Sequence, residues 1–460
     1  MLEPDNTPNR KGENQEPNSE DYTAGGDERL VWLAPDHEDS RGQAWRPEPR
    51  RKTGSAFSKL PDPAEDQIFA MMARFEERLI KDPHAVNLGV GIYRNDRGVT
   101  PLPEAVKEAA RRVLEKQCTG EINGGYLPIE GLRAFNEGVV NLVLGEDNPL
   151  ISAGKIKAVQ TPGGTAAVRL AVEFLGRAGV SSVHVSDPTW GNHHKVIGEA
   201  GLKSERYPYL DIKTGELDFD RMNAHIQSLP EGSAVLMHAC CHNPSGVDPS
   251  PEQWLELADT FNKRGHIAFF DMAYQGFGNG FEEDALAPRV FAEAGVDTLV
   301  AYSFSKNAGL YDQRTGALIV VSQDPALSEG NVLGNLKEIA RTTWSNPPAF
   351  GARVMAEIFA DNSLRAGWIE EVNGYRAGIQ ERRELMVEKF NEKGLPLYGI
   401  DKQKGMFALY VGIRPGQVER LEDESAVFML PNGRINVAAI TPGNVCYVAD
   451  SIAAAIKEVP

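Results

Sequence analysis

Short apolar runs alternate with longer amphipathic stretches from about residue 150 onward, and this alternation constrains the fold more than any other feature. The runs that have the length of buried strands are 157–160, 182–186, 234–238, 266–271, 298–303 and 316–321. Helical spacing occurs between them, for example at 166–175 and 251–262. Strands that alternate with helices form mostly parallel sheets with helices on both faces. The sequence therefore predicts an α/β fold.

The flanking regions have a different texture. Residues 1 to about 60 are rich in Pro, Asn, Glu, Asp, Arg and Gly with little periodicity, so we expect a disordered N-terminal extension. Its early acidic residues disfavour a transit peptide, and it has no apolar stretch for a secretory signal. Residues 67–79 have helical spacing, and 86–93 (VNLGVGIY) resemble a short extended segment. A long helical stretch at about 363–393 precedes weaker signals that predict a second, smaller domain.

Composition excludes several kinds of partner. Among 460 residues, 48 basic against 65 acidic side chains give a net charge of −17, which disfavours a nucleic acid because phosphate backbones need basic surfaces. No apolar run approaches the roughly 20 residues of a membrane span. No CxxC pair occurs among the cysteines, which are Cys118, Cys240, Cys241 and Cys446. This pattern indicates neither a disulfide framework nor a zinc site and fits a cytoplasmic protein without metal, nucleic-acid or membrane partner.

A glycine pair follows the first strand candidate. Residues 161–165 read TPGGT and stand between a strand and a helix. Glycine lets the backbone approach a ligand closely, and the free N–H groups of the next helix favour a phosphate. The segment is neither the dinucleotide fingerprint GxGxxG nor a Walker loop. Taken alone, it is better explained as a plain turn before a helix.

Two further strand ends carry charged residues. Asp271 ends one strand candidate, Lys306 follows the next in SFSKN, and Arg314 stands eight residues later. A desolvated Lys is a Schiff-base nucleophile, and Arg binds phosphate bidentately. Each residue alone could be a loop cap or a surface charge. Together with the glycine pair they supply an amine, an acid for a pyridinium nitrogen and a phosphate site, the combination that pyridoxal phosphate needs.

These residues stand within longer matches to a known family. The chain resembles the class I, fold-type I, pyridoxal-phosphate-dependent aminotransferases, in the group of aspartate and aromatic aminotransferases. The resemblance runs from about Asp66 to the C-terminus and rests on the segments VNLGVGIYRND, GYLPIEGL, VQTPGGTAA, VSDPTWGNHH, CCHNPSGVDP, FFDMAYQGF, YSFSKNAGLYDQRTG, RTTWSNPPAFGA, KGMFAL and GRINVAAIT.

The resemblance implies an architecture. A large domain over residues 101–374 would contain a mostly parallel seven-stranded sheet flanked by helices and bind the cofactor. Residues 61–100 and 375–460 would form a smaller α+β domain, with 1–60 as the extension. The resemblance also implies a homodimer whose active sites are shared across the interface.

The resemblance assigns cofactor-binding roles. Lys306 would form a covalent aldimine with pyridoxal 5′-phosphate and later carry a proton. Asp271 would pair with the pyridinium nitrogen, and His193 would hydrogen-bond behind it. The phosphate would be held by Gly163, Gly164, Thr165, Ser303, Arg314 and, from the other subunit, Tyr126.

Three further residues would surround the cofactor ring. Tyr274 and Asn243 would contact its 3′ oxygen, and Trp190 would stack on it. The residues that the resemblance implies to be catalytic are Lys306, Asp271, Tyr274 and Trp190.

The resemblance also implies a substrate site. Arg434 would bind the α-carboxylate, and Arg341 of the neighbouring subunit would bind the distal carboxylate of aspartate or glutamate. The residues that would line this site are Gly91, Trp190, Asn243, Arg341, Asn346 and Arg434.

The implied reaction moves the amino group of L-aspartate to 2-oxoglutarate in a ping-pong mechanism, with amino acids and 2-oxo acids as the partners. Residue types associated with aspartate specificity stand at Thr100, Thr165 and Asn346. Departures from that pattern stand at Ile92, Arg94 and Gly125, and Met71 stands where a Leu is usual near the substrate mouth. A preference for tyrosine or phenylalanine therefore stays open.

Two other classes are disfavoured by the same residues. A non-catalytic, ligand-sensing relative would not need Lys306, and the N-terminal residues are too acidic and irregular for a helix-turn-helix. A β-lyase or decarboxylase would not need the pair Arg341 and Arg434.

Overall fold

The computed structural model describes residues 55–62, 66–95, 98–324, 326 and 328–457. Most of the expected N-terminal extension, residues 1–54, therefore lies outside the described part. The chain forms two separate units, residues up to 64 and residues 65–460. The described part of the first unit is a 3-10 turn over Ala56–Lys59 with its flanking residues. The second unit contains the sheet and its helices.

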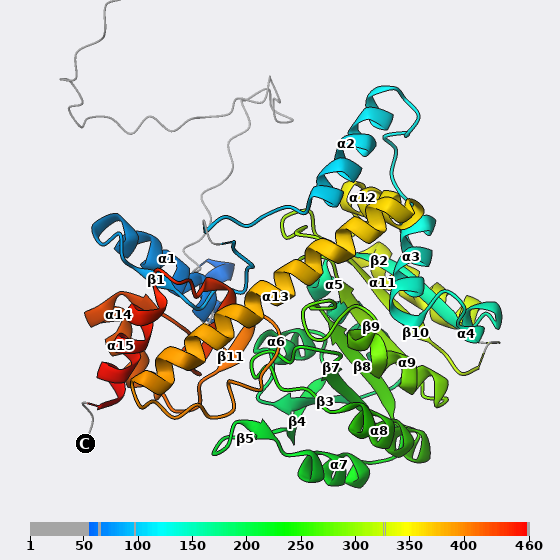
Figure 1. The fold of residues 1–460 in the computed structure, drawn as a ribbon. Helices are drawn as coiled ribbons and strands as arrows, with labels where there is room; N and C mark the ends of the chain where they lie inside the picture. Colours follow the sequence, from blue (N-terminus) through cyan, green and yellow to red (C-terminus); the bar gives the residue numbers. More distant parts are fainter. Residues whose placement is uncertain (1–54, 63–65, 96–97, 325, 327, 458–460) are drawn as a thin grey trace, which may run out of the picture. The chain divides into compact units, whose positions relative to one another are not determined.

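A seven-stranded sheet lies at the centre of the second unit (Figure 1). Its strand order is β2-β10-β9-β8-β7-β3-β4, and only β10 is antiparallel to its neighbours. The strands are β2 (Ile156–Pro162), β3 (Ser182–Asp187), β4 (Lys203–Pro208), β7 (Ala234–His238), β8 (Ile267–Met272), β9 (Thr298–Ser303) and β10 (Thr315–Val321). This arrangement confirms the predicted α/β fold with a mostly parallel seven-stranded sheet.

Both faces of the sheet are covered by helices, because successive side chains of a strand point to opposite faces. On β8, Phe269 packs in one apolar core and Phe270 in the other. The first core is closed by α5 (Gly164–Arg177), α6 (Asn192–Glu199) and α11 (Gly334–Thr343). The second is closed by α2 (Glu104–Cys118), α3 (Arg133–Leu144), α7 (Phe219–Ser228), α8 (Pro251–Arg264), α9 (Leu286–Glu293) and α12 (Ala349–Ala360).

Helix boundaries follow local signals, as α8 illustrates. Ser250 accepts a hydrogen bond from the backbone of Gln253, whose side chain bonds back to the backbone of Ser250, in a capping box. Pro251 occupies the first turn, where no N–H is needed. The helix ends at Gly265, which has a φ of 61° in the left-handed region.

The sequence pattern did not predict β4, because β4 lies at the edge of the sheet. β4 reads KSERYP and only Tyr207 in it is buried, so it has no continuous apolar run. The segment predicted as extended at 86–93 contains only a two-residue strand, β1 (Val86–Asn87). In contrast, the strand predicted at 298–303 coincides with β9.

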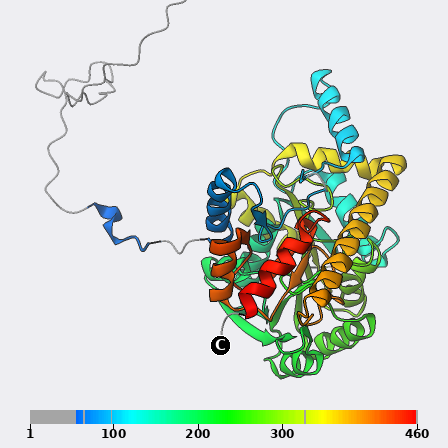
Figure 2. The same ribbon diagram turned by 60° about the vertical axis from the view of Figure 1, so that its left-hand side comes forward.

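The remaining elements do not belong to the seven-stranded sheet. β1 pairs in parallel with β12 (Val427–Phe428), and β11 (Phe407–Leu409) pairs antiparallel with β13 (Arg434–Asn436). The long helix α13 (Asn362–Glu392) packs against α15 (Val445–Lys457), and the two lie side by side in Figures 1 and 2. The other elements are α1 (Gln67–Lys81), α4 (Pro149–Ser152), β5 (Leu210–Asp211), β6 (Glu216–Leu217) and α14 (Pro415–Ser425). Across the described residues, no helix has the length and apolarity that crossing a bilayer requires.

Candidate active site

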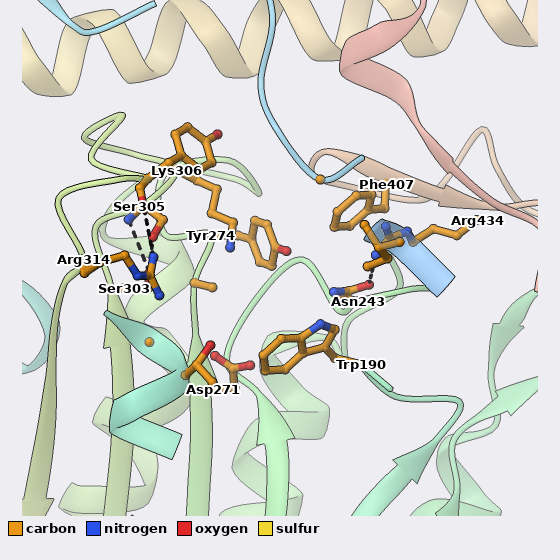
Figure 3. A pocket seen from close by; sticks show the side chains of 16 residues that line it. Trp190, Asn243, Asp271, Tyr274, Ser303, Ser305, Lys306, Arg314, Phe407 and Arg434 are labelled. Atoms are coloured by element: carbon orange, nitrogen blue, oxygen red, sulfur yellow. Dashed lines mark hydrogen bonds between the residues drawn. The ribbon is translucent and has the colours of Figure 1, made fainter. Parts of the chain in front are cut away.

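A pocket of about 260 Å³ opens at the carboxyl ends of β8 and β9 (Figure 3). Open α/β sheets bind ligands at this edge. The pocket is lined by Ile68, Gly91, Gly164, Thr165, Trp190, Asn243, Asp271, Ala273, Tyr274, Ser303, Ser305, Lys306, Tyr311, Arg314, Phe407 and Arg434. Most of the residues that the sequence singled out therefore meet in one cavity.

Asp271 is the acidic group of the pocket and is 8% exposed near the end of β8. His193 lies behind it, with Nε2 3.1 Å from the Asp271 carboxylate and Nδ1 2.9 Å from the hydroxyl of Thr189. Since an ionised carboxylate only accepts, Nε2–H donates to Asp271 and Nδ1 accepts from Thr189. Burial acts to raise the pKa of Asp271, but the hydrogen bond from His193 and the positive charge of Lys306 outweigh it, so the net shift is downward. The carboxylate stays ionised at neutral pH.

Lys306 is the amine of the pocket and follows β9. Its Nζ lies 4.8 Å from the ring centroid of Tyr274, and the two side chains approach each other in Figure 3. Burial lowers the pKa of Lys306 to about 8, although the charge of Asp271 opposes this shift. A substantial fraction of the amine is therefore neutral near physiological pH, as a nucleophile or proton acceptor requires.

The glycine pair stands where α5 begins. A Cβ at Gly163 would lie 2.6 Å from a guanidinium nitrogen of Arg314, and one at Gly164 would lie 2.9 Å from Cβ of Ser303. Gly163 also has a φ of 81°, which disfavours any other residue. The side chain of Arg314 therefore packs directly on the loop, beside the free N–H groups at the start of α5.

A second cation, Arg434, enters from β13 and is 4% exposed. Its Nη1 donates to Oδ1 of Asn243 at 3.1 Å and its Nη2 to the carbonyl oxygen of Gly89 at 2.6 Å. Its guanidinium lies over the ring of Phe407, 4.2 Å from the centroid. Burial lowers the pKa of Arg434 to about 10, so the group remains charged at neutral pH.

Trp190 forms the wall between the two ends of the pocket. It is half-buried, and its ring meets that of His193 edge-on with centroids 5.2 Å apart. In Figure 3 it lies between Asp271 and Asn243. An aromatic face beside a carboxylate suits a flat, positively charged ring.

Five predicted site residues do not line this pocket. Gly163 and His193 lie directly behind lining residues. Tyr126 is 96% exposed, and Arg341 is an exposed residue near the end of α11 whose Nη1 donates to Oγ of Ser345 at 2.5 Å. Asn346 donates to the carbonyl oxygen of Leu127 at 2.7 Å. The last three thus stand apart from the pocket of their own chain.

Several lining residues were not predicted from the sequence. These residues are Ala273, Ser305, Tyr311 and Phe407. All four stand in segments on which the family resemblance rests, but they carry no charge that would have indicated a role in the site. Ile68 lines the pocket, whereas Met71, expected near the substrate mouth, is 1% exposed in an apolar core and faces Gly89. Met71 therefore packs against the residue whose carbonyl oxygen accepts from Arg434, one helical turn after Ile68.

Comparisons with known proteins agree with this geometry. Residues 83–452 match the family model of aminotransferase class I and II. An aspartate aminotransferase of Escherichia coli strain K12 is 40% identical over 403 residues, which cover 87% of this chain and 100% of that protein. An aromatic-amino-acid aminotransferase of the same strain is 39% identical over 404 residues, which cover 86% and 99%. The crystal structure of an aromatic-amino-acid aminotransferase from Burkholderia pseudomallei, covalently bound to pyridoxal phosphate, has a TM-score of 0.83 and 38% identity and covers 88% of this chain and 100% of that one.

Proposed function

Because the chain belongs to the class I and II aminotransferases, we propose that it transfers the amino group of L-aspartate to 2-oxoglutarate, giving oxaloacetate and L-glutamate. The observation that carries this proposal is one pocket that contains the amine of Lys306, the carboxylate of Asp271 and the cation of Arg434. In a ping-pong reaction the amino acid leaves its amino group and departs as a 2-oxo acid before the second 2-oxo acid enters. Aromatic amino acids are the alternative substrates, because relatives of both names are about equally similar.

Pyridoxal phosphate is the cofactor of this family, and the pocket fits it. When bound, it supplies an aldehyde that links to amines and a ring that withdraws electrons from the α-carbon of an amino acid. The crowded backbone at Gly163 and Gly164 supports a phosphate site at the start of α5, with Arg314 as the cation. The proposed phosphate site also includes Thr165 and Ser303, which line the pocket.

We assign the ring contacts to residues around Asp271. The buried, ionised carboxylate of Asp271 would accept a hydrogen bond from the protonated ring nitrogen, and His193 would hold that carboxylate in place. Trp190 would stack on the ring face. Tyr274 and Asn243 would donate to its 3′ oxygen, a role supported by their burial in the pocket wall.

Lys306 would hold the cofactor and then move the proton. Its Nζ would take the proton from the α-carbon of the amino acid and deliver it to C4′, the cofactor carbon that keeps the amino group. A pKa of about 8 supports this role, because general acid–base catalysis is most effective when the pKa lies near the working pH. Tyr274, whose ring lies 4.8 Å from Nζ, would restrict where the amine moves.

Arg434 would bind the α-carboxylate of the substrate, next to Gly91. Its Nη1 is already oriented by Asn243 and Nη2 by the carbonyl of Gly89, and its Nε has no hydrogen-bond partner among the described residues. A buried cation in this state favours a carboxylate ligand, since charge-assisted bonds are strong in a dry site.

We further propose a homodimer in which each chain completes the site of the other. Tyr126 would reach the partner's phosphate, and Arg341 with Asn346 would bind the distal carboxylate of the partner's substrate. The proposal is supported by the exposure of Tyr126 and Arg341 and by their position outside the pocket of their own chain.

The proposed domain division has residues 101–374 binding the cofactor and residues 61–100 and 375–460 forming a smaller domain. It is supported by the pairing of β1 with β12, which joins the two outer segments. We also propose a cytoplasmic location, supported by four free cysteines, and fractionation of cells would test it.

A single-turnover spectrum of the purified protein tests the function. L-aspartate, added without a 2-oxo acid, should abolish the visible band of the Lys306-bound cofactor at a far lower concentration than L-tyrosine or L-phenylalanine. Equal or better conversion by the aromatic amino acids would establish the alternative. A protein with no such band after addition of pyridoxal phosphate would contradict the role of Lys306.

A further inference from the structure

Arg383 is a buried cation that the proposed chemistry does not use. It lies in α13, is 1% exposed, and among the described residues its side chain donates only to main-chain carbonyl oxygens. No carboxylate of the described chain forms an ion pair with it. Burial lowers its pKa to about 10, so the guanidinium stays charged at neutral pH. Burying such a group is costly unless hydrogen bonds replace those that it makes with water, and here the carbonyl oxygens supply them.

The three carbonyls belong to the segment that leads into β11. Nη2 donates to Gly405 at 2.6 Å and to Phe407 at 3.2 Å, and Nη1 donates to Ile400 at 3.4 Å. Carbonyls in an irregular segment have few backbone partners, and a planar guanidinium can serve several of them at once. Arg383 therefore clamps residues 400–407 against α13.

Other contacts also pack this segment tightly. The backbone N–H of Lys404 donates to the carbonyl of Gly246 at 2.6 Å. A Cβ at Gly405 would lie 2.6 Å from Cβ of Cys241, and Gly405 has a φ of 72°. The segment has little room to shift, so its position depends on the hydrogen bonds from Arg383 together with these contacts.

The clamped segment ends at a residue that touches the substrate-binding cation. The ring of Phe407 lies 4.2 Å from the guanidinium of Arg434 and meets the ring of Tyr274 edge-on at 5.8 Å. In the same strand pair, Leu409 of β11 is the register partner of Arg434. A shift of the backbone at Phe407 is thus transmitted to Arg434 through both the ring and the strand.

We propose that Arg383 is a positioning residue for substrate binding: through the carbonyls of Gly405 and Phe407 it sets the place of the Phe407 ring and hence of the Arg434 guanidinium that receives the α-carboxylate. This inference rests on the proposed role of Arg434. It assigns to Arg383 an effect on carboxylate affinity and not on the proton transfer at Lys306.

The neighbouring Arg382 provides a matched control. It is 7% exposed on the same helix and also donates to main-chain carbonyls, those of Arg94 and Ala438. Neither of those residues lines the pocket. Lysine at position 382 or 383 keeps the charge but cannot serve several carbonyls in one plane.

The experiment compares the holoenzyme variants R383K and R382K. We expect R383K to raise KM for L-aspartate about tenfold while kcat stays within about threefold, and to weaken the binding of succinate, a dicarboxylate without an amino group, by a similar factor in calorimetry. R382K should leave both quantities within about twofold. Equal effects of the two variants on KM, or a lower unfolding temperature of R383K with unchanged KM and succinate affinity, would overturn the proposal.

Two further variants keep the test decisive. If R383K does not fold, F407L takes its place, because it leaves Arg383 intact and removes the ring that contacts Arg434; an unchanged KM in F407L would overturn the proposal. R434K separates this inference from the function itself. If R434K leaves carboxylate affinity unchanged, the role of Arg434 is wrong, whereas loss of affinity in R434K but not in R383K contradicts only the role of Arg383.

Discussion

Two regions of the molecule differ in the burial of their proposed site residues. One is the pocket at the carboxyl edge of the sheet, and the other is the surface formed by the end of α11 and the loop after α2. In the pocket at the sheet edge, Asp271 and Arg434 are buried and hydrogen-bonded to neighbours of the same chain, and Lys306 is half-buried beside Tyr274. At the exposed surface, Tyr126 is 96% accessible, and the side chain of Arg341 hydrogen-bonds to no residue of the described chain except Ser345. The same resemblance assigned both groups to one active site.

The difference teaches how the proposed site would be divided. One chain suffices to bury the amine, the acid and the α-carboxylate cation, because they stand at the ends of its own strands. Tyr126, proposed to bind the cofactor phosphate, and Arg341, proposed to bind the distal carboxylate, are exposed, where a second copy of the chain could receive them. Substitutions in the two regions should therefore differ in kind as well as in size.

The largest effect is expected in the buried region, for Lys306→Ala. Loss of the covalent amine and proton carrier should lower kcat for L-aspartate on the order of 10⁵-fold and remove the visible absorption band. Lys402→Ala is the control, because Lys402 is exposed and pairs with Glu216 at 2.6 Å. A K306A protein that retains more than a hundredth of the activity would show that another group moves the proton.

The exposed region is tested by Arg341→Ala. Removing the arginine of the proposed arginine–carboxylate pair should lower kcat/KM for L-aspartate about 10²-fold. For L-phenylalanine, which has no distal carboxylate, kcat/KM should fall less than about threefold. Steady-state kinetics with both amino acids provide the measurement. Lys337→Ala removes a positive charge from the same helix and should change neither value. Equal losses on both amino acids would rule out the proposed distal-carboxylate role.

The pKa of Lys306 makes a prediction about pH. Well below pH 8 the amine is protonated in both folded and unfolded chains, so its burial penalty is fully present. Between pH 8 and its unfolded value of 10.5 the unfolded chain binds the additional proton, and stability rises with pH. The cofactor-free protein should therefore gain up to about 3 kcal/mol relative to Lys306→Met over this range. Urea unfolding at several pH values measures it, and a constant difference between the two proteins would contradict the shift.

The smallest effect is expected for Tyr126→Phe. Loss of one hydrogen bond to the partner's phosphate should speed cofactor release about fivefold, which corresponds to about 1 kcal/mol. Tyr447→Phe is the control, because its hydroxyl bonds to the carbonyl of Ser425 away from the pocket. Release that is unchanged in Y126F, measured by dialysis and absorbance, would argue that Tyr126 does not reach a phosphate.

Residues at strand ends were the most predictable part of the site. Asp271 ends one apolar run and Lys306 follows the next, and the ends of neighbouring parallel strands meet at one edge, so local patterns alone indicated the convergence of these two residues. β4 was missed because an edge strand needs no apolar run. Phe407 and Arg383 gave no signal, since an apolar residue in a strand and an Arg in a helix are ordinary in any fold.

The sequence by itself determined the α/β class, the strand ends that carry charge and, through its resemblance to a family, the chemistry. Only the tertiary structure decided which distant segments share the pocket: Arg434 contacts Gly89 across 345 positions of the chain, and α13 supplies Arg383 to the segment before β11. The physical reason is that periodicity and spacing encode contacts within an element. Contacts between remote elements depend instead on how whole surfaces pack, and that information is spread over the entire chain.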